Sequence, residues 1–276
     1  IPFRLLVHLS VTEIHELACY GCVMLREVRF HKDVTKIGRY SFQRCSNLER
    51  IELPEGLLRL EDLAFCGCTS LREVLIPASV RFMGDEVFDG CTSLERVVFA
   101  PRTTSIELGG RIFSDCSDLR FVTLPQNLQS IPEWFFKNCT ALTHIRIPAS
   151  VNQLRGAAFY GSGIQAIAIL ENDEFIPGTI MLPPNLQSIP HYCFYNCKSL
   201  THIRIPPSVE EIGAAAFSGS GLRSIEVLEN VNQIGPEACR NCLFLERVTF
   251  HSSHNLIMAD EIFANCPLLS VIMMYP

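Results

Sequence analysis

Cysteine is the residue with the most obvious capacity for chemistry in this 276-residue chain, because a thiolate can form a disulfide, bind zinc or attack a substrate. Two pairs among the 13 cysteines, Cys19/Cys22 and Cys239/Cys242, have the CxxC spacing of zinc ligands. The pairs lie near opposite ends of the chain, whereas structural zinc needs four ligands together. The odd number and the length are also unlike a disulfide scaffold. We expect no metal and no cofactor.

Other candidate reactive groups are isolated. His251 and His254 have the spacing of two metal ligands, but no acid or cysteine at a suitable spacing supports them, and a polar loop is the expected structure. Asn138-Cys139-Thr140 is formally a glycosylation sequon. The chain has no P-loop, no GxGxxG after a strand, no HExxH and no GxSxG elbow. We therefore predict that the chain is not an enzyme and has no catalytic residues.

The spacing of the cysteines is that of a repeat. One column of cysteines recurs at intervals of about 23 residues, and a leucine follows each one after three positions. The column consists of Cys22, Cys45, Cys68, Cys91, Cys116, Cys139, Cys197, Cys242 and Cys266. A phenylalanine precedes most of them by three positions, as Phe88 precedes Cys91. We interpret the column as small buried residues that fill a tight slot, not as reactive thiols.

Each repeat can be divided into elements that would position these columns. In Asn47 to Pro54, alternating apolar residues predict a short strand, and the proline ends it because it lacks an N–H. An apolar pair such as Val80/Met83 marks a return segment that could form a second strand. A short helical turn is expected to carry the Phe inward. The residue before the cysteine slot is mostly Gly or Asn, which predicts a left-handed cap.

Stacked units of this kind form a continuous core. The unit L-x-x-I-x-L-P-x-x-V-x-x-I-x-x-x-A-F-x-x-C resembles the BspA-type leucine-rich repeat, and Leu60 to Val80 (LEDLAFCGCTSLREVLIPASV) fits it closely. The resemblance covers essentially the whole chain. From the repeats we expect an α/β fold of about twelve stacked parallel strands with short helical turns, forming a single domain over residues 1–276. The resemblance implies a right-handed leucine-rich-repeat solenoid. It also implies roles in protein binding or cell-surface adhesion, and it supplies no catalytic residues.

The repeat is irregular in three parts of the chain. A duplication with an offset of 58 residues leaves a truncated repeat near residues 170–180, where we expect a break in the regular wall. Residues 101–110 contain a two-residue insertion that should bulge. Neither end has a distinctive cap, and the first residue is Ile1, so we expect a fragment or processed chain whose ends meet another domain or copy. A monomer or weak end-to-end association is expected.

Composition excludes several classes of partner. The formal net charge is −6 and only 19% of residues are charged, which argues against a nucleic-acid binder. No apolar run reaches the roughly 18–20 residues that span a membrane. The compartment stays open: free cysteines favour an intracellular protein, whereas the family resemblance favours the cell surface.

The outward strand positions suggest where a partner would bind. Up to Arg120, acidic and basic residues alternate in two columns, and we attribute the alternation to the relief of repulsion between stacked like charges. Beyond it the columns contain different residues, and we take these as partner-binding candidates: Phe121, His144, Arg146, His202 and Arg204. We predict a protein–protein interaction module. The alternatives are a cell-surface adhesin or glycan receptor, and a structural or regulatory arm of a larger protein.

Overall fold

The computed structural model describes residues 3–101, 106–169, 179–251 and 256–275. These residues group into two compact units. The N-terminal unit comprises Ile1–Leu128 and Phe135–Leu142, and the C-terminal unit comprises Gln129–Trp134 and Thr143–Pro276. Both are built from parallel β-strands that recur once per repeat, as predicted. That the two units make one domain stays a prediction.

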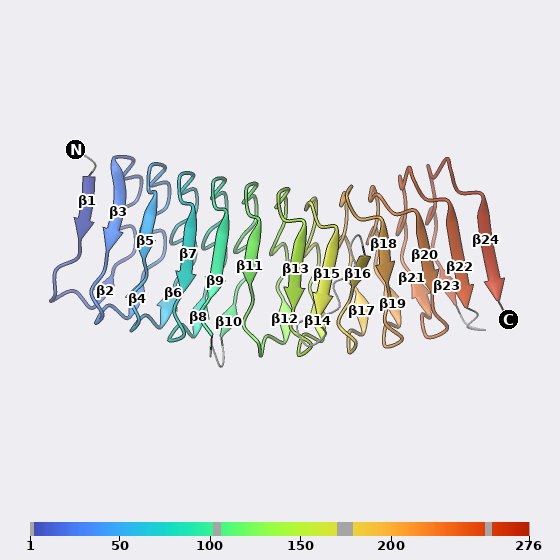
Figure 1. Ribbon diagram of the computed structural model, residues 1–276, viewed down its shortest axis with the longest axis horizontal. Helices are drawn as coiled ribbons and strands as arrows, with labels where there is room; N and C mark the ends of the chain where they lie inside the picture. The colour runs from blue at the N-terminus through green and yellow to red at the C-terminus, as the bar shows by residue number, and fades with distance from the viewer. Residues whose placement is uncertain (1–2, 102–105, 170–178, 252–255, 276) are drawn as a thin grey trace. The chain divides into compact units, whose positions relative to one another are not determined.

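In the N-terminal unit, the longer strands lie side by side and form what we call the strand face (Figure 1). They pair in parallel within two three-stranded sheets, so residues at equivalent repeat positions are neighbours; Val74, for example, pairs with Val97. These strands are β1 (Phe3–Leu6), β3 (Leu25–Arg29), β5 (Arg50–Glu52), β7 (Glu73–Ile76), β9 (Arg96–Phe99) and β11 (Phe121–Thr123).

The return segments form a second parallel sheet of two-residue strands, which confirms the predicted second strand of each unit. In each strand of this sheet the first residue is exposed or partly exposed, as Arg59 is. The second residue is buried in four of the five strands, as Leu60 is. The strands are β2 (Glu13–Ile14), β4 (Lys36–Ile37), β6 (Arg59–Leu60), β8 (Phe82–Met83) and β10 (Glu107–Leu108). The insertion at 101–110 falls partly outside the described residues, and β10 pairs with β8 after it.

The C-terminal unit repeats this plan. Its strand face consists of β13 (His144–Ile147), β15 (Ala166–Ile169), β16 (Thr179–Met181), β18 (His202–Arg204), β20 (Ser224–Val227), β22 (Arg247–His251) and β24 (Val271–Tyr275). Its short strands are β12 (Ser130–Ile131), β14 (Gln153–Leu154), β17 (Ser188–Ile189), β19 (Glu211–Ile212), β21 (Gln233–Ile234) and β23 (Ile257–Met258).

The truncated repeat lies within the C-terminal unit. Strand β15 pairs directly with β16, through Ile167 and Ile180, although only 13 residues separate these partners. Phe159 stacks on Phe194 with ring centroids 5.5 Å apart, so the turns on either side of the short unit are direct neighbours. The predicted break in the wall falls at residues 170–178, which lie outside the described residues.

Columns of identical side chains make up the core. Phe42, Phe65, Phe88 and Phe113 are fully buried and stack nearly parallel, with ring centroids 5.2–6.0 Å apart. The Cys and Leu columns are buried in most repeats, as Cys91 and Leu94 are. Burial of these columns was predicted from the repeat and is confirmed at these positions.

The predicted short helical turns, and with them the α part of the α/β class, are wrong: none of the described residues is helical, and both units consist of parallel β-strands and turns. The segment before each cysteine, which we call the Phe turn, has two left-handed residues instead of one. In the repeat that contains Phe42 they are Tyr40, with φ 57°, and Arg44, with φ 60°. Alternate N–H groups donate to the next repeat, as that of Phe42 does to the Ala64 carbonyl. A helix would keep those bonds within its own segment. It follows that no described residue belongs to a helix that could cross a membrane.

Candidate functional site

On the strand face of the N-terminal unit, the alternating charges neutralise one another. Arg26 lies 2.6 Å from Glu49, and Arg96 lies 3.7 Å from Glu73. All four side chains are at least 42% exposed, so each ion pair contributes roughly 0–1 kcal/mol to stability. This face therefore offers a partner little unbalanced charge at these pairs.

Phe121, a predicted binding residue, belongs to this network. It pairs in register with Arg96 and is 43% exposed, and the Arg96 guanidinium lies 4.4 Å from its ring centroid. A cation–π contact thus covers one face of the ring. Phe121 lies in the N-terminal unit, whereas the other four predicted residues lie in the C-terminal unit.

His144 and Arg146 lie on β13, and His202 and Arg204 lie on β18, all with exposed side chains. The parallel register through β15 and β16 aligns His144 with His202 and Arg146 with Arg204. The register positions between them carry small or flexible residues: Ala166 and Ala168, which are buried, and Thr179 and Met181, which are partly exposed. The structure thus brings these four predicted residues onto one sheet.

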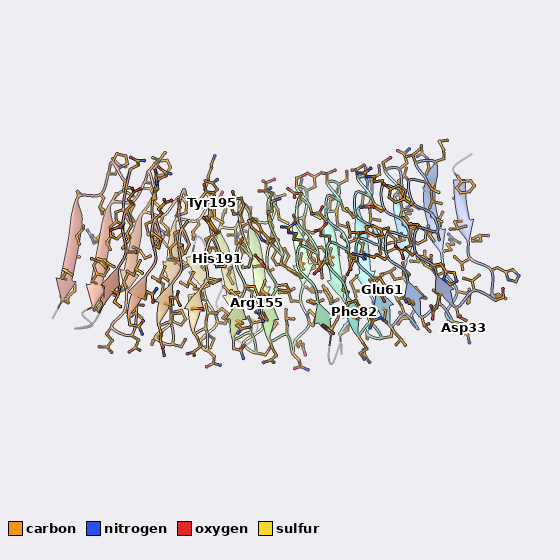
Figure 2. All side chains as sticks on the ribbon, turned by 180° about the vertical axis from the view of Figure 1, so that it is seen from behind. Asp33, Glu61, Phe82, Arg155, His191 and Tyr195 are labelled. Atoms are coloured by element: carbon orange, nitrogen blue, oxygen red, sulfur yellow. The ribbon has the colours of Figure 1, made fainter. Side chains whose placement is uncertain are left out.

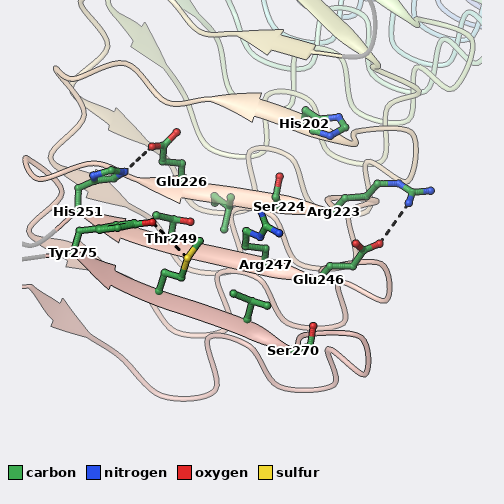
Figure 3. Close-up of a pocket in the computed structure, with 13 residues that line it drawn as sticks. His202, Arg223, Ser224, Glu226, Glu246, Arg247, Thr249, His251, Ser270 and Tyr275 are labelled. Atoms are coloured by element: carbon green, nitrogen blue, oxygen red, sulfur yellow. Dashed lines mark hydrogen bonds and ion pairs between the residues drawn. The ribbon is translucent and has the colours of Figure 1, made fainter.

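An open groove of about 640 Å³ begins at His202 and extends over β20, β22 and β24 (Figure 3). We call it the C-terminal groove. Its lining consists of His202, Arg223, Ser224, Ile225, Glu226, Glu246, Arg247, Thr249, His251, Ser270, Val271, Met273 and Tyr275. Of the predicted binding residues, only His202 lines it.

Two acid–base pairs lie in the C-terminal groove. The Nη1 atom of Arg223 is 3.5 Å from Glu246 Oε1, and the Nε2 atom of His251 is 2.6 Å from Glu226 Oε1. The His251 ring stacks on Tyr275 with centroids 5.5 Å apart. Arg247 lies between the two pairs (Figure 3) and makes no ion pair with any residue that the structure describes.

This arrangement suits recognition better than catalysis. The groove is open and its acid–base pairs are exposed, whereas catalytic electrostatics depend on a site from which water is excluded. Across the described ranges, no three His, Cys, Asp or Glu side chains are grouped as metal ligands. His254, the second histidine of the HxxH spacing, lies outside the described residues.

Sequence reasoning missed Arg247, Glu226 and Tyr275 as groove residues, and took His251 for a loop residue. His251 is in fact the last residue of β22 and pairs with Tyr275 of β24. The signal was available, because His251 and Tyr275 occupy the same repeat position 24 residues apart. It was missed because neither histidine nor tyrosine is one of the residue types that recur in the columns used to define the repeat.

Two other surface features are less suited to binding. A hollow of about 300 Å³ in the N-terminal unit is less than half the volume of the C-terminal groove, and Lys36 and Glu61 of its lining pair at 3.8 Å (Figure 2 labels Glu61). In the C-terminal unit, Tyr160 and Tyr195 stack with centroids 4.8 Å apart, and Trp134 lies against Tyr160. These aromatic rings pack against one another, so the cluster is best explained as a ladder of rings that stabilises the stacked repeats.

The repeat geometry agrees with a family model. Residues 12–117, 107–180 and 178–275 match the model described as "BspA type Leucine rich repeat region (6 copies)". The chain belongs to the BspA-type leucine-rich repeat family. This confirms the resemblance inferred from the sequence. Among curated proteins, none matches the chain.

Solved structures of bacterial leucine-rich repeat proteins have a similar fold. One from Eubacterium ventriosum is 18% identical with a TM-score of 0.63, and the match covers 98% of this chain and 72% of that one. A leucine-rich cell surface protein from Faecalibacterium prausnitzii is 22% identical with a TM-score of 0.54, covering 99% and 88%. A protein from Bacteroides ovatus is 24% identical with a TM-score of 0.49, covering 98% and 86%. The likeness to the first two of these structures shows the fold alone.

Proposed function

We propose that this BspA-type repeat protein is a protein-interaction module that binds its partner through the strand face of the C-terminal unit. The observation that carries the proposal is the C-terminal groove, an open depression of about 640 Å³ over four neighbouring strands. Its lining combines Arg247 with Met273 and Tyr275. Arginine, methionine and tyrosine are enriched at protein interfaces.

The rest of the molecule supports binding rather than catalysis. A leucine-rich-repeat solenoid is typically a non-enzymatic fold, built from rigid strands that present side chains at fixed spacing. The groove's own pairs are exposed, so a partner can replace them at low cost in free energy. His144, Arg146 and Arg204 would extend the same face beyond the groove, while Phe121 stays a separate prediction for the N-terminal unit.

A groove-filling variant tests the proposal. Ser224→Tyr with Thr249→Tyr places two large side chains in the lining, and we expect the variant to lose most of the protein partner captured from lysate and identified by mass spectrometry. The matched control, Glu211→Tyr with Gln233→Tyr, puts the same residues at exposed, paired positions on β19 and β21. Capture that is equal in the two variants would contradict the use of the groove.

The wider face can be tested in the same assay. Arg146→Glu with Arg204→Glu reverses two exposed charges outside the groove lining. We expect reduced capture and an unchanged circular dichroism spectrum, since neither side chain makes an ion pair within the described ranges. Unchanged capture would restrict the interface to the groove.

The adhesin or glycan alternative predicts a different ligand for the same face. If the groove-filling variant loses binding to immobilised surface glycans and captures protein as well as the control does, the glycan receptor replaces the protein-interaction module as the conclusion. The third alternative, an arm of a larger protein, predicts a partner within the same polypeptide.

A further inference from the structure

We propose that the C-terminal groove binds an extended segment of a partner protein that carries one acidic side chain, and that this carboxylate pairs with Arg247. The inference rests on the proposed function and names the chemistry of the partner. It is carried by the length of the groove, by Arg247, which has no ion pair in the described residues, and by the residues that flank Arg247.

The size of the groove indicates an extended chain. Its lining comes from β18, β20, β22 and β24, so it extends across three strand spacings, or roughly 14 Å. An extended peptide rises about 3.3 Å per residue and would cross the groove with about four residues. A single small anion would leave most of the 640 Å³ unfilled.

The charges in the groove indicate an acid. Both carboxylates of the groove already have a hydrogen-bond partner, since Glu246 accepts from Arg223 and Glu226 contacts His251. Arg247 is the remaining cation, and its guanidinium can bind a carboxylate with two parallel hydrogen bonds. Arg204, on β18, which neighbours β20, adds a second cation that lies outside the groove lining and has no ion pair in the described residues. The chain as a whole has a net charge of −6, so this part of the face departs from the molecular average.

The flanking residues limit the ligand to one acid with neutral neighbours. Glu226 and Glu246 lie on either side of Arg247 (Figure 3) and would repel a polyanion whose charge recurs at every unit. Met273 and Val271 supply apolar contacts, and Ser224, Thr249 and Ser270 supply hydroxyl groups. A protein segment can place one acid between apolar or polar neutral residues, whereas a densely sulfated glycan carries charge on most of its units.

Selection from a phage-displayed library of random octapeptides tests the inference on the full chain. We expect the selected peptides to carry a single Asp or Glu flanked by neutral residues. Arg247→Glu should weaken their binding at least about ten-fold, because it replaces a charge-assisted pair by repulsion. Selection on Arg247→Glu should instead enrich Lys or Arg. The matched control is Arg155→Glu, which makes the same charge change at an exposed position after β14, away from the groove (Figure 2).

The outcomes separate this inference from the proposed function. Two results would contradict the acidic segment and leave the protein-interaction module intact. In the first, the selected peptides no longer bind when the groove is filled but contain no acid. In the second, the peptides bind Arg247→Glu as well as they bind the unchanged protein. Peptides insensitive to groove filling would count against both. Heparin is the second probe: heparin binding that depends on Arg247, with no selected peptide, would replace the protein segment by a sulfated glycan. Circular dichroism melts of both variants check folding, and Arg247→Ala repeats the measurement if the charge reversal unfolds.

Discussion

At the scale of single residues, each buried thiol of the cysteine column both fills volume and makes a hydrogen bond. Cys91 Sγ donates to the Phe65 carbonyl at 3.3 Å, and Cys116 Sγ donates to the Phe88 carbonyl at 3.2 Å. The acceptor in each case belongs to the preceding repeat. Serine occupies the slot at Ser162 and Ser220, which are also buried. The slot therefore requires a small side chain with a donor as well as the small volume that we predicted.

Burial of these thiols predicts alkaline sensitivity. Desolvation raises the pKa of the Cys197 thiol to about 12, from an ordinary value near 9. Between pH 9 and pH 12 the thiol is deprotonated in the unfolded chain but stays protonated in the folded chain. The contribution of this thiol to the free energy of unfolding is therefore fully present below pH 9 and decreases as the pH rises above it. We expect a loss on the order of 1 kcal/mol per pH unit for each such thiol.

Urea unfolding at pH 8, 9 and 10 under reducing conditions measures this slope. Cys197→Ser, which keeps a donor in the slot but does not ionise, should reduce the slope by one thiol's share. A free energy of unfolding that is constant up to pH 10 would show that the thiols are not protected from ionisation.

At the scale of elements, the Phe turn explains how a strand-only solenoid closes each coil. Each turn contains two left-handed residues, and the N–H groups between them alternate between a carbonyl three residues back and a carbonyl in the next repeat. In the repeat of Phe65, for example, the Leu63 N–H donates to the Asp85 carbonyl and the Cys66 N–H donates to the Leu63 carbonyl. The turns thus add a third ladder of bonds to the two sheets.

The second left-handed position predicts a ranking of substitutions. Gly90 has φ +68°, and a Cβ there would have only ordinary contacts, so the cost of a side chain is conformational. We expect Gly90→Ala to lower the free energy of unfolding by about 1–2 kcal/mol. Gly90→Asn should cost less, because Asn138 and Asn241 take this conformation in the equivalent slot. Equal losses for the two variants, measured by urea unfolding, would contradict this explanation.

At the scale of the whole molecule, the phenylalanine columns test whether the two units act as one domain. Phe88 lies in the N-terminal unit and Phe217 in the C-terminal unit, and both are fully buried. Phe88→Ala and Phe217→Ala should each cost about 3–5 kcal/mol. If residues 1–276 form a single domain, each variant lowers the temperature of one shared unfolding transition, since nearest-neighbour coupling links all repeats.

Calorimetry of the two variants decides between these outcomes. Leu75→Ala is the control, because Leu75 is 54% exposed and its truncation leaves no cavity. A loss below about 1 kcal/mol for Phe88→Ala would contradict the stacked core. Two transitions, each shifted by only one of the phenylalanine variants, would show that the two units unfold separately.

Much of this architecture was determined by the sequence itself. A 23-residue period of Phe, Gly or Asn, Cys and Leu predicts parallel strands in register, buried columns and a left-handed residue before each cysteine, because stacking repeats place identical side chains one strand spacing apart. The outward alternation of charge in the N-terminal unit was equally readable, since Arg26 and Glu49 occupy the same position in successive repeats.

Only the tertiary structure decided the form of the turn and the place of the groove. The first left-handed position of each turn is filled by residues as different as Leu63, Glu86 and Trp134, so no local preference predicts it; hydrogen bonds between neighbouring repeats impose it. The groove likewise depends on which outward side chains pair and which do not. That His251 binds Glu226 while Arg247 makes no ion pair within the described chain follows from strand register and side-chain reach, which the order of residues does not specify.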